Sequence, residues 1–221
     1  MSPRPRTAVD TTVAFLAEAI VDGDHDPGDR LVEGEIAARY EVSRSTARAA
    51  LQVLAARGLV TVAPGRAARV AAIADDDAVA LYRIRNRVEP MLIHRFAERA
   101  APAQVAALDR AMEAFEEVAS ASQDIRRIHR MRDGFYEVLY DGAASIALEQ
   151  TVRAEYTRLG AYRHRRLAPE QELARIRGMA ATIRRVVPRI LRRESSAASV
   201  FSHRMLSEDG AATLRALRSA S

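Results

Sequence analysis

The sequence predicts a mainly α-helical protein, in which an N-terminal winged helix-turn-helix with a small β-hairpin wing precedes an all-α antiparallel helical bundle. First, hydrophobic residues make up 48% of the 221 residues but aromatic residues only 5%, a balance that favours packed helices over β-sandwiches. Second, residues 31–70 have the pattern of two short helices followed by a hairpin. Third, from about residue 77 the apolar spacing is helical almost throughout.

The composition excludes several classes of protein. The chain has no cysteine, which excludes disulfides, thiolate metal sites and cysteine nucleophiles. No apolar run approaches the ~18 residues of a membrane-spanning helix, and the first residues lack the apolar segment of a signal peptide. We therefore expect a cytoplasmic protein.

Three short helices are predicted in the first sixty residues, at about 11–21, 33–40 and 44–57. The sequence Asp26-Pro27-Gly28 is a strong turn signal between the first two, and Glu41-Val42 forms the turn before the third. Ser43 is suited to the N-cap of the third helix, because its hydroxyl can accept a hydrogen bond from an otherwise unpaired backbone N–H.

A hairpin is predicted after the third helix. Residues 59–62 and 69–72 have strand patterns, Pro64-Gly65 turns between them, and Arg66 lies at the tip. In a helix-turn-helix the second helix of the pair enters the DNA major groove, and its N-terminal residues reach the base edges. Those positions are held here by Ser43, Arg44, Ser45 and Arg48.

The chemistry of these side chains suits DNA. Arg44 and Arg48 are four residues apart and share one helix face, and either can donate two parallel hydrogen bonds to guanine, a contact worth about 1–3 kcal/mol of discrimination. Ser43 and Ser45, with the first backbone amides, can hold a phosphate at the helix N-terminus. Arg66 can reach a phosphate or a minor groove. The alternative is that these arginines are only solvated surface charges.

Charge is segregated within this N-terminal region. Residues 10–35 contain eight acidic residues and one arginine, whereas residues 39–70 contain six arginines and one glutamate. Over residues 1–73 nine arginines balance nine acids, so bulk attraction to a phosphate backbone cannot explain recognition. The placement of Arg44, Arg48 and Arg66 has to provide it.

The rest of the chain is predicted to be one helical domain. We expect a DNA-binding domain at 1–73, a linker at 74–78 and a helical effector-binding and dimerisation domain at 79–221. The acidic run Asp75–Asp77 has an alternative role as the N-terminal charge of the following helix. Pro188 should kink or split its helix. The helices are expected at about 77–99, 102–119, 123–142, 145–166, 170–194 and 196–219.

The N-terminal region resembles the GntR family of bacterial transcription factors. The segments that carry the resemblance are DPGDRL, EIAARY, EVSRSTARAALQVLAARGLV and APGRAARV. The resemblance implies DNA contacts by Arg44, Ser45, Arg48 and Gly65. Two departures are that Gly34 stands where the family often has an arginine, and that Ala67 and Ala68 replace a glycine-rich wing tip. The full set of candidate DNA-binding residues is Ser43, Arg44, Ser45, Thr46, Arg48, Gly65 and Arg66.

Residues 79–206 resemble the FCD type of GntR effector domain, through LYRIRNRVEP and RMRDGFYEVLYDGAASIAL. Many FCD domains hold a divalent metal through one Asp and three His. The corresponding positions here are Arg132, Tyr136, Ala181 and His203, and Asp133 is one residue out of register. Because such an ion needs three or four protein ligands, we expect no metal and no cofactor; a rearranged metal site is the alternative.

Loss of the cation changes what the effector pocket can bind. Arg132 could replace the positive charge of the metal and pair with a small carboxylate effector. The tentative pocket residues are Arg85, Arg132, Tyr136, Tyr140 and His203, with His203 expected in the core or in the pocket. The alternative is a pocket filled by side chains that binds no effector.

Together these features predict a sequence-specific DNA-binding transcriptional regulator, a repressor more than an activator, located in the cytoplasm at the nucleoid. We expect a homodimer formed through the bundle that binds an inverted-repeat operator in double-stranded DNA. One alternative is a ligand-sensing or protein-interaction module with weakened DNA binding. An enzyme is not expected, because the sequence has neither a nucleophile–base pairing nor the Glu-x-x-His pairs of a di-iron bundle.

Overall fold

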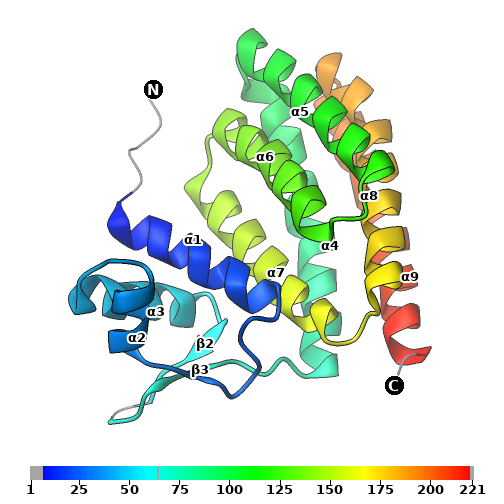
Figure 1. Cartoon of the computed structure of the whole chain (residues 1–221). Coiled ribbons are helices and arrows are strands. Elements are labelled where there is room, and N and C mark those ends of the chain that lie inside the picture. The colour runs from blue at the N-terminus through cyan, green and yellow to red at the C-terminus, as the bar shows by residue number, and fades with distance from the viewer. Residues whose placement is uncertain (1–6, 64, 220–221) are drawn as a thin grey trace. The chain divides into compact units, whose positions relative to one another are not determined.

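The computed structural model describes residues 7–63 and 65–219, which form two compact units. The first unit holds the chain up to Ala78 together with Tyr156–Arg165, and the second holds Val79–Glu155 and Arg166–Ser221. Figure 1 shows helices and a small sheet in the first unit and helices in the second. The predicted fold class, a winged helix-turn-helix followed by a helical bundle, is confirmed.

The three predicted N-terminal helices form close to their expected positions, as α1 (Ala8–Val21), α2 (Glu33–Arg39) and α3 (Arg44–Ala56). Thr7 begins α1 through a capping box with Asp10, three residues earlier than the apolar pattern indicated. Ser43 caps α3 as predicted, since its hydroxyl accepts a hydrogen bond from the Thr46 backbone N–H at 3.0 Å.

The wing contains one more strand than the sequence predicted. Its sheet is formed by β1 (Arg30–Leu31), β2 (Val60–Thr61) and β3 (Ala68–Val70), in the antiparallel order β1-β3-β2. The first strand pairs Leu31 with Ala68, whereas the sequence analysis treated Leu31 only as the lead into α2. Two residues are too few for an alternating pattern, so only the tertiary pairing reveals this strand.

One apolar core joins these elements. Leu16 of α1, Leu54 of α3 and Leu59 before β2 are each 1% exposed or less. The α3 face that contains Ala47, Leu51 and Leu54 is buried, as its spacing predicted. Since this face is buried against α1 and α2, the opposite face of α3 is directed to solvent.

The bundle follows the predicted helix order. Its helices are α4 (Asp75–Arg99), α5 (Pro102–Ala121), α6 (Ile125–Ala143), α7 (Ile146–His164), α8 (Pro169–Leu191) and α9 (Ser195–Ser219). Residues 74–78, the expected linker, are helical from Asp75 onward, and the acidic run lies in the first turn of α4. Pro188 does not split α8, because it lies in the last turn and the helix ends at Leu191.

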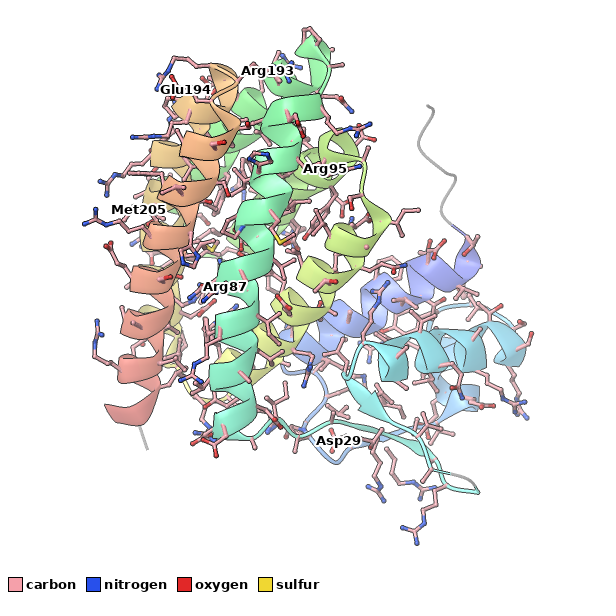
Figure 2. The ribbon with its side chains drawn as sticks, turned by 180° about the vertical axis from the view of Figure 1, so that it is seen from behind. Asp29, Arg87, Arg95, Arg193, Glu194 and Met205 are labelled. Atoms are coloured by element: carbon pink, nitrogen blue, oxygen red, sulfur yellow. The ribbon has the colours of Figure 1, made fainter. Side chains whose placement is uncertain are left out.

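Arginine side chains close two helix ends within the bundle. Arg95 of α4 donates from Nε to the carbonyl of Ala143, at the end of α6, at 2.8 Å. Arg193, in the turn after α8, donates to the carbonyl of Ala97 in α4 at 3.2 Å. Figure 2 labels both arginines. These bonds satisfy one carbonyl at the end of α6 and one in the last turn of α4, and they connect α4 to α6 and to the turn after α8.

Two glycines of α6 differ in the space around them, and this difference makes a testable prediction. A Cβ at Gly142 would lie 2.2 Å from Phe96 Cε2, whereas a Cβ at Gly134 would meet nothing within 4 Å. Gly142→Ala should therefore lower the free energy of unfolding by about 1–3 kcal/mol through overpacking. The control, Gly134→Ala, should raise it by up to about 1 kcal/mol through helix propensity. Chemical denaturation followed by circular dichroism measures both; equal stabilities would contradict the described packing.

Candidate nucleic-acid interface

The exposed N-terminus of α3 brings the predicted serine and threonine together. The Ser43 hydroxyl lies 2.8 Å from the Ser45 hydroxyl and 2.8 Å from that of Thr46. All three are exposed or partly exposed, beside the backbone N–H groups of the first helical turn. Hydroxyls and backbone amides at a helix N-terminus form a site suited to an anion. The geometry is thus compatible with a phosphate contact at this point.

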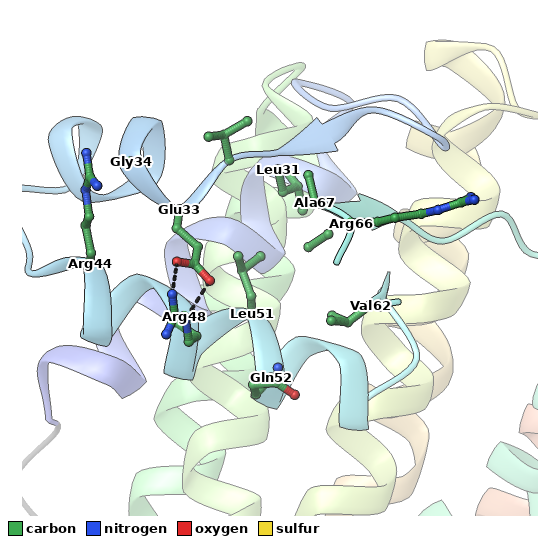
Figure 3. Close-up of a pocket in the computed structure, with 12 residues that line it drawn as sticks. Leu31, Glu33, Gly34, Arg44, Arg48, Leu51, Gln52, Val62, Arg66 and Ala67 are labelled. Carbon is green, nitrogen blue, oxygen red and sulfur yellow. Dashed lines mark hydrogen bonds and ion pairs between the residues drawn. The ribbon is translucent and has the colours of Figure 1, made fainter. Parts of the chain in front are cut away.

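Arg44 and Arg48 both lie on the exposed side of α3. The guanidinium of Arg44 lies over Gly34 of α2, where a Cβ would meet its Nη2 at 3.7 Å. Gly34 therefore leaves open space that Arg44 partly occupies. Figure 3 shows this arginine and Gly34 at one end of the groove described below.

Arg48 is held by a carboxylate that the sequence analysis did not select. Its Nε and Nη2 donate to Oε1 and Oε2 of Glu33, at 2.7 and 2.8 Å. The hydrogen bonds between the two groups lower the pKa of Glu33 and raise that of Arg48. The two residues are 15 positions apart and come from α2 and α3, so no local sequence pattern could predict the pair. The only available signal was an acid in the first turn of α2.

A groove of about 350 Å³ runs between α3 and the wing. Figure 3 shows its lining, with the Glu33–Arg48 pair near the middle and Arg66 on the wing side. Gln52 also lines the groove, four residues after Arg48 and exposed, and it was not among the predicted residues. The groove is lined by Leu31, Val32, Glu33, Gly34, Arg44, Arg48, Leu51, Gln52, Val62, Arg66, Ala67 and Ala68.

The wing tip is built around Gly65, whose φ of +70° favours glycine. Arg66 follows it, exposed, with its backbone N–H bonded to the carbonyl of Ala63 at 3.1 Å. The family resemblance placed Ala68 in the wing tip, but the residue is buried in β3 opposite Leu31 and is not part of the tip. The predicted turn residue Pro64 lies outside the described residues.

In the bundle, two of the tentative pocket residues belong to one buried polar network. Arg85 donates from Nε to Glu89 at 2.9 Å, and both side chains are only 2% exposed. The Tyr136 hydroxyl donates to the other oxygen of Glu89 at 2.5 Å. Asp209 of α9 lies 3.8 Å from Arg85. Arg85 and Tyr136 thus meet through Glu89, which the sequence analysis had not chosen.

The other three tentative pocket residues have different principal partners, although the Tyr140 ring lies 6.0 Å from the ring of Tyr136. Arg132 is buried and donates to Asp133 at 2.6 and 2.8 Å, so a carboxylate of the chain already accepts from it. The Tyr140 ring carries the guanidinium of Arg153 at 4.3 Å from its centroid. The expectation of a core His203 is wrong, because its side chain is exposed and Ser202 takes the inward position on α9. Its Nδ1 lies 2.5 Å from the carbonyl of Asn86 in α4, and its role in a pocket stays a prediction.

The donor set for the metal that the FCD resemblance implies does not fit. Among the described residues, no group of three or more His, Asp or Glu side chains could hold an ion. At the corresponding positions Arg132 and Tyr136 bond to carboxylates instead.

Among the residues that the structure describes, no helix combines the length and apolar character that crossing a membrane requires.

Comparison with known proteins supports the two-part organisation. Residues 9–70 match the family described as bacterial regulatory proteins, gntR family, and residues 80–208 match the FCD domain. The uncharacterized HTH-type transcriptional regulator YdhC of Bacillus subtilis (strain 168) is 25% identical over 126 residues, which span 57% of this chain and 56% of that relative. The chain thus aligns with little more than half the length of this curated relative.

Two solved structures have the same fold along nearly the whole chain. E. coli McbR/YncC superposes with a TM-score of 0.76 at 18% identity, covering 95% of this chain and 98% of that one. A putative transcriptional regulator GntR from Rhodococcus sp. RHA1 gives 0.65 at 22% identity, covering 93% and 97%. At these identities the likeness establishes the fold.

The buried network yields a prediction about stability. Tyr136→Phe removes the hydroxyl that donates to Glu89, and should lower the free energy of unfolding by about 1–3 kcal/mol. The same change made in a Glu89→Gln background should cost measurably less, because the charged acceptor is already gone. A double-mutant cycle from denaturation curves measures this coupling; additive losses would show that the charge of Glu89 adds nothing to the bond.

Proposed function

The chain belongs to the GntR family of bacterial transcriptional regulators and carries an FCD effector domain, and we propose that it acts as a homodimeric repressor on an inverted-repeat operator. The observation that carries the proposal is the exposed face of α3, where Arg44 and Arg48 border one groove with the wing residue Arg66. The first turns of a recognition helix reach base edges, and a wing arginine can reach the backbone beside them. The proposed contacts are Ser43, Arg44, Ser45, Thr46, Arg48, Gly65 and Arg66.

The two parts of the chain would divide the work. We assign DNA binding to residues 1–73, and dimerisation with effector response to residues 79–221. A dimer is expected because operators with two half-sites require two recognition helices at a defined spacing. We place the protein in the cytoplasm, at the nucleoid, where its DNA target lies.

An effector of this protein would be a small anion recognised without a metal. Arg85 and Arg132 are both buried within the bundle and provide cationic groups there. Each already contacts a carboxylate of the chain, so an acidic effector would have to exchange with Glu89 or Asp133. A planar guanidinium can form paired hydrogen bonds with either kind of carboxylate. Exchange of this kind would couple effector binding to the packing of α4 and α6.

The absence of a metal is itself testable. Elemental analysis of the purified protein should find far less than one equivalent of Zn, Ni or Mn per subunit, because the ligand set is incomplete. Dialysis against a chelator should leave the thermal unfolding midpoint unchanged. One tightly held equivalent per subunit, with loss of stability on chelation, would contradict the proposal and indicate a rearranged site.

Substitution of the recognition arginines tests the DNA-binding assignment. Arg44→Ala or Arg48→Ala should each weaken operator binding by about tenfold to a hundredfold, as expected for loss of a base contact of about 1–3 kcal/mol. The matched control is Arg39→Ala, which removes an exposed arginine from the end of α2, outside the groove.

The measurement is a gel shift with promoter DNA from the protein's own gene and its neighbours, accompanied by thermal melts to confirm folding. Unchanged affinity in the Arg48 variant would exclude the recognition-helix assignment. Absence of any shift with the unmodified protein would favour a ligand-sensing module with weakened DNA binding.

A further inference from the structure

We propose that Glu33 is a positioning residue that fixes the guanidinium of Arg48 for reading one guanine, so that sequence preference at that base depends on the pair. The inference rests on the proposed DNA-binding function and names the residue that gives it specificity. Glu33 was not among the predicted DNA-binding residues.

The geometry of the pair leaves the reading edge of the arginine open. A guanidinium has five N–H donors, and Glu33 takes one from Nε and one from Nη2. Both hydrogens of Nη1 and the second hydrogen of Nη2 remain, and these form the end-on fork that can meet guanine O6 and N7. Glu33 thus holds one edge of the guanidinium while the other is available to a base. The Arg48 side chain is 69% exposed, which makes that edge accessible.

Folding stability does not account for this pair. Its members are 69% and 34% exposed, and an ion pair in such a position contributes little to stability because water screens the charges. The carboxylate also lies in the groove that would face the DNA, where an unpaired negative charge would repel phosphates. A glutamate here is favourable only if its bond to Arg48 improves recognition by more than its charge costs.

The backbone positions of Glu33 and Arg48 are fixed by the packing of α2 and α3 in the core. Ala47 and Leu51, which flank Arg48 on α3, are buried, and Ile36 anchors α2 in the same core. Both ends of the ion pair therefore come from helices that are fixed relative to each other within this unit. A free arginine loses rotamer entropy when it binds, and holding the guanidinium beforehand reduces the part that is lost.

Arg44 shows the contrast. It lies over Gly34 and contributes a weaker, longer-range attraction to Glu33 than the hydrogen-bonded Arg48 does. We assign discrimination chiefly to Arg48, because its guanidinium is oriented by two hydrogen bonds. Gln52 lies one helical turn further along the same face and extends the row of polar groups in the groove.

The test measures base preference as well as affinity. The full-length protein is first used to select its preferred sites from a pool of duplexes with a randomised centre. Equilibrium binding is then measured for the best duplex, for copies with each G·C pair replaced by A·T, and for an unrelated duplex, at several salt concentrations. The variants are Glu33→Ala, Glu33→Gln and Arg48→Ala. The control is Glu35→Ala. Glu35 is an exposed acid in the same helical turn as Glu33, but it does not line the groove.

Glu33→Ala and Glu33→Gln should reduce the preference for guanine at one position by about five-fold to fifty-fold, and Arg48→Ala should abolish preference at the same position. The affinity of Glu33→Ala for the unrelated duplex should stay the same or increase, because the released arginine can contact a phosphate. The slope of its log affinity against log salt concentration should become steeper by about one counterion. Glu35→Ala should keep the full base preference. Thermal melts should show all variants folded.

Two results would overturn the inference. If Glu33→Ala keeps the base preference of the unmodified protein at every position, Glu33 does not position Arg48 for reading. If it binds the best duplex more tightly with a sharper guanine preference, Glu33 restrains Arg48 instead of orienting it. Failure of the unmodified protein to enrich any sequence would be a different result, because it would reject the proposed function together with this inference.

Discussion

Burial of one face of α3 determines where the polar groups of this helix lie in the candidate interface. Ala47, Leu51 and Leu54 are 3% exposed or less, so rotation of the helix about its axis would expose apolar surface at a cost of about 25 cal/mol per Å². This constraint directs Arg44 and Arg48 to solvent. It also brings Arg48 within reach of α2, and the bidentate contact with Glu33 follows from that packing.

The two units place charged groups in very different environments. In the groove, Glu33 and Arg48 are exposed and their pairing affects orientation more than stability. In the bundle, Arg85 and Glu89 are buried, where removal of either partner would leave an uncompensated charge at a cost of several kcal/mol. An Arg–Glu pair thus lies on the surface in the groove, where we propose that it orients Arg48, whereas in the bundle it is buried on α4 and the Tyr136 hydroxyl connects it to α6.

Particular residues show how far the sequence could be interpreted. Ser43 as the N-cap of α3 and the buried stripe on that helix were predictable, because both depend on neighbours within a few positions. The strand Arg30–Leu31 was not, since it exists only through pairing with β3. His203 was expected in the core or in the pocket, but which residue of α9 faces inward depends on the packing of that helix, and Ser202 takes that position.

The sequence by itself determined the order of helices, the helix-turn-helix with its wing, and the family to which the chain belongs, because local periodicity and motif spacing carry that information. Tertiary structure decided which charges meet. Glu33 reaches Arg48 across 15 residues and Tyr136 reaches Glu89 across 47, distances over which no periodic pattern extends. Which donors remain available to a base or an effector therefore depends on the packing of helices, and only the folded chain could show it.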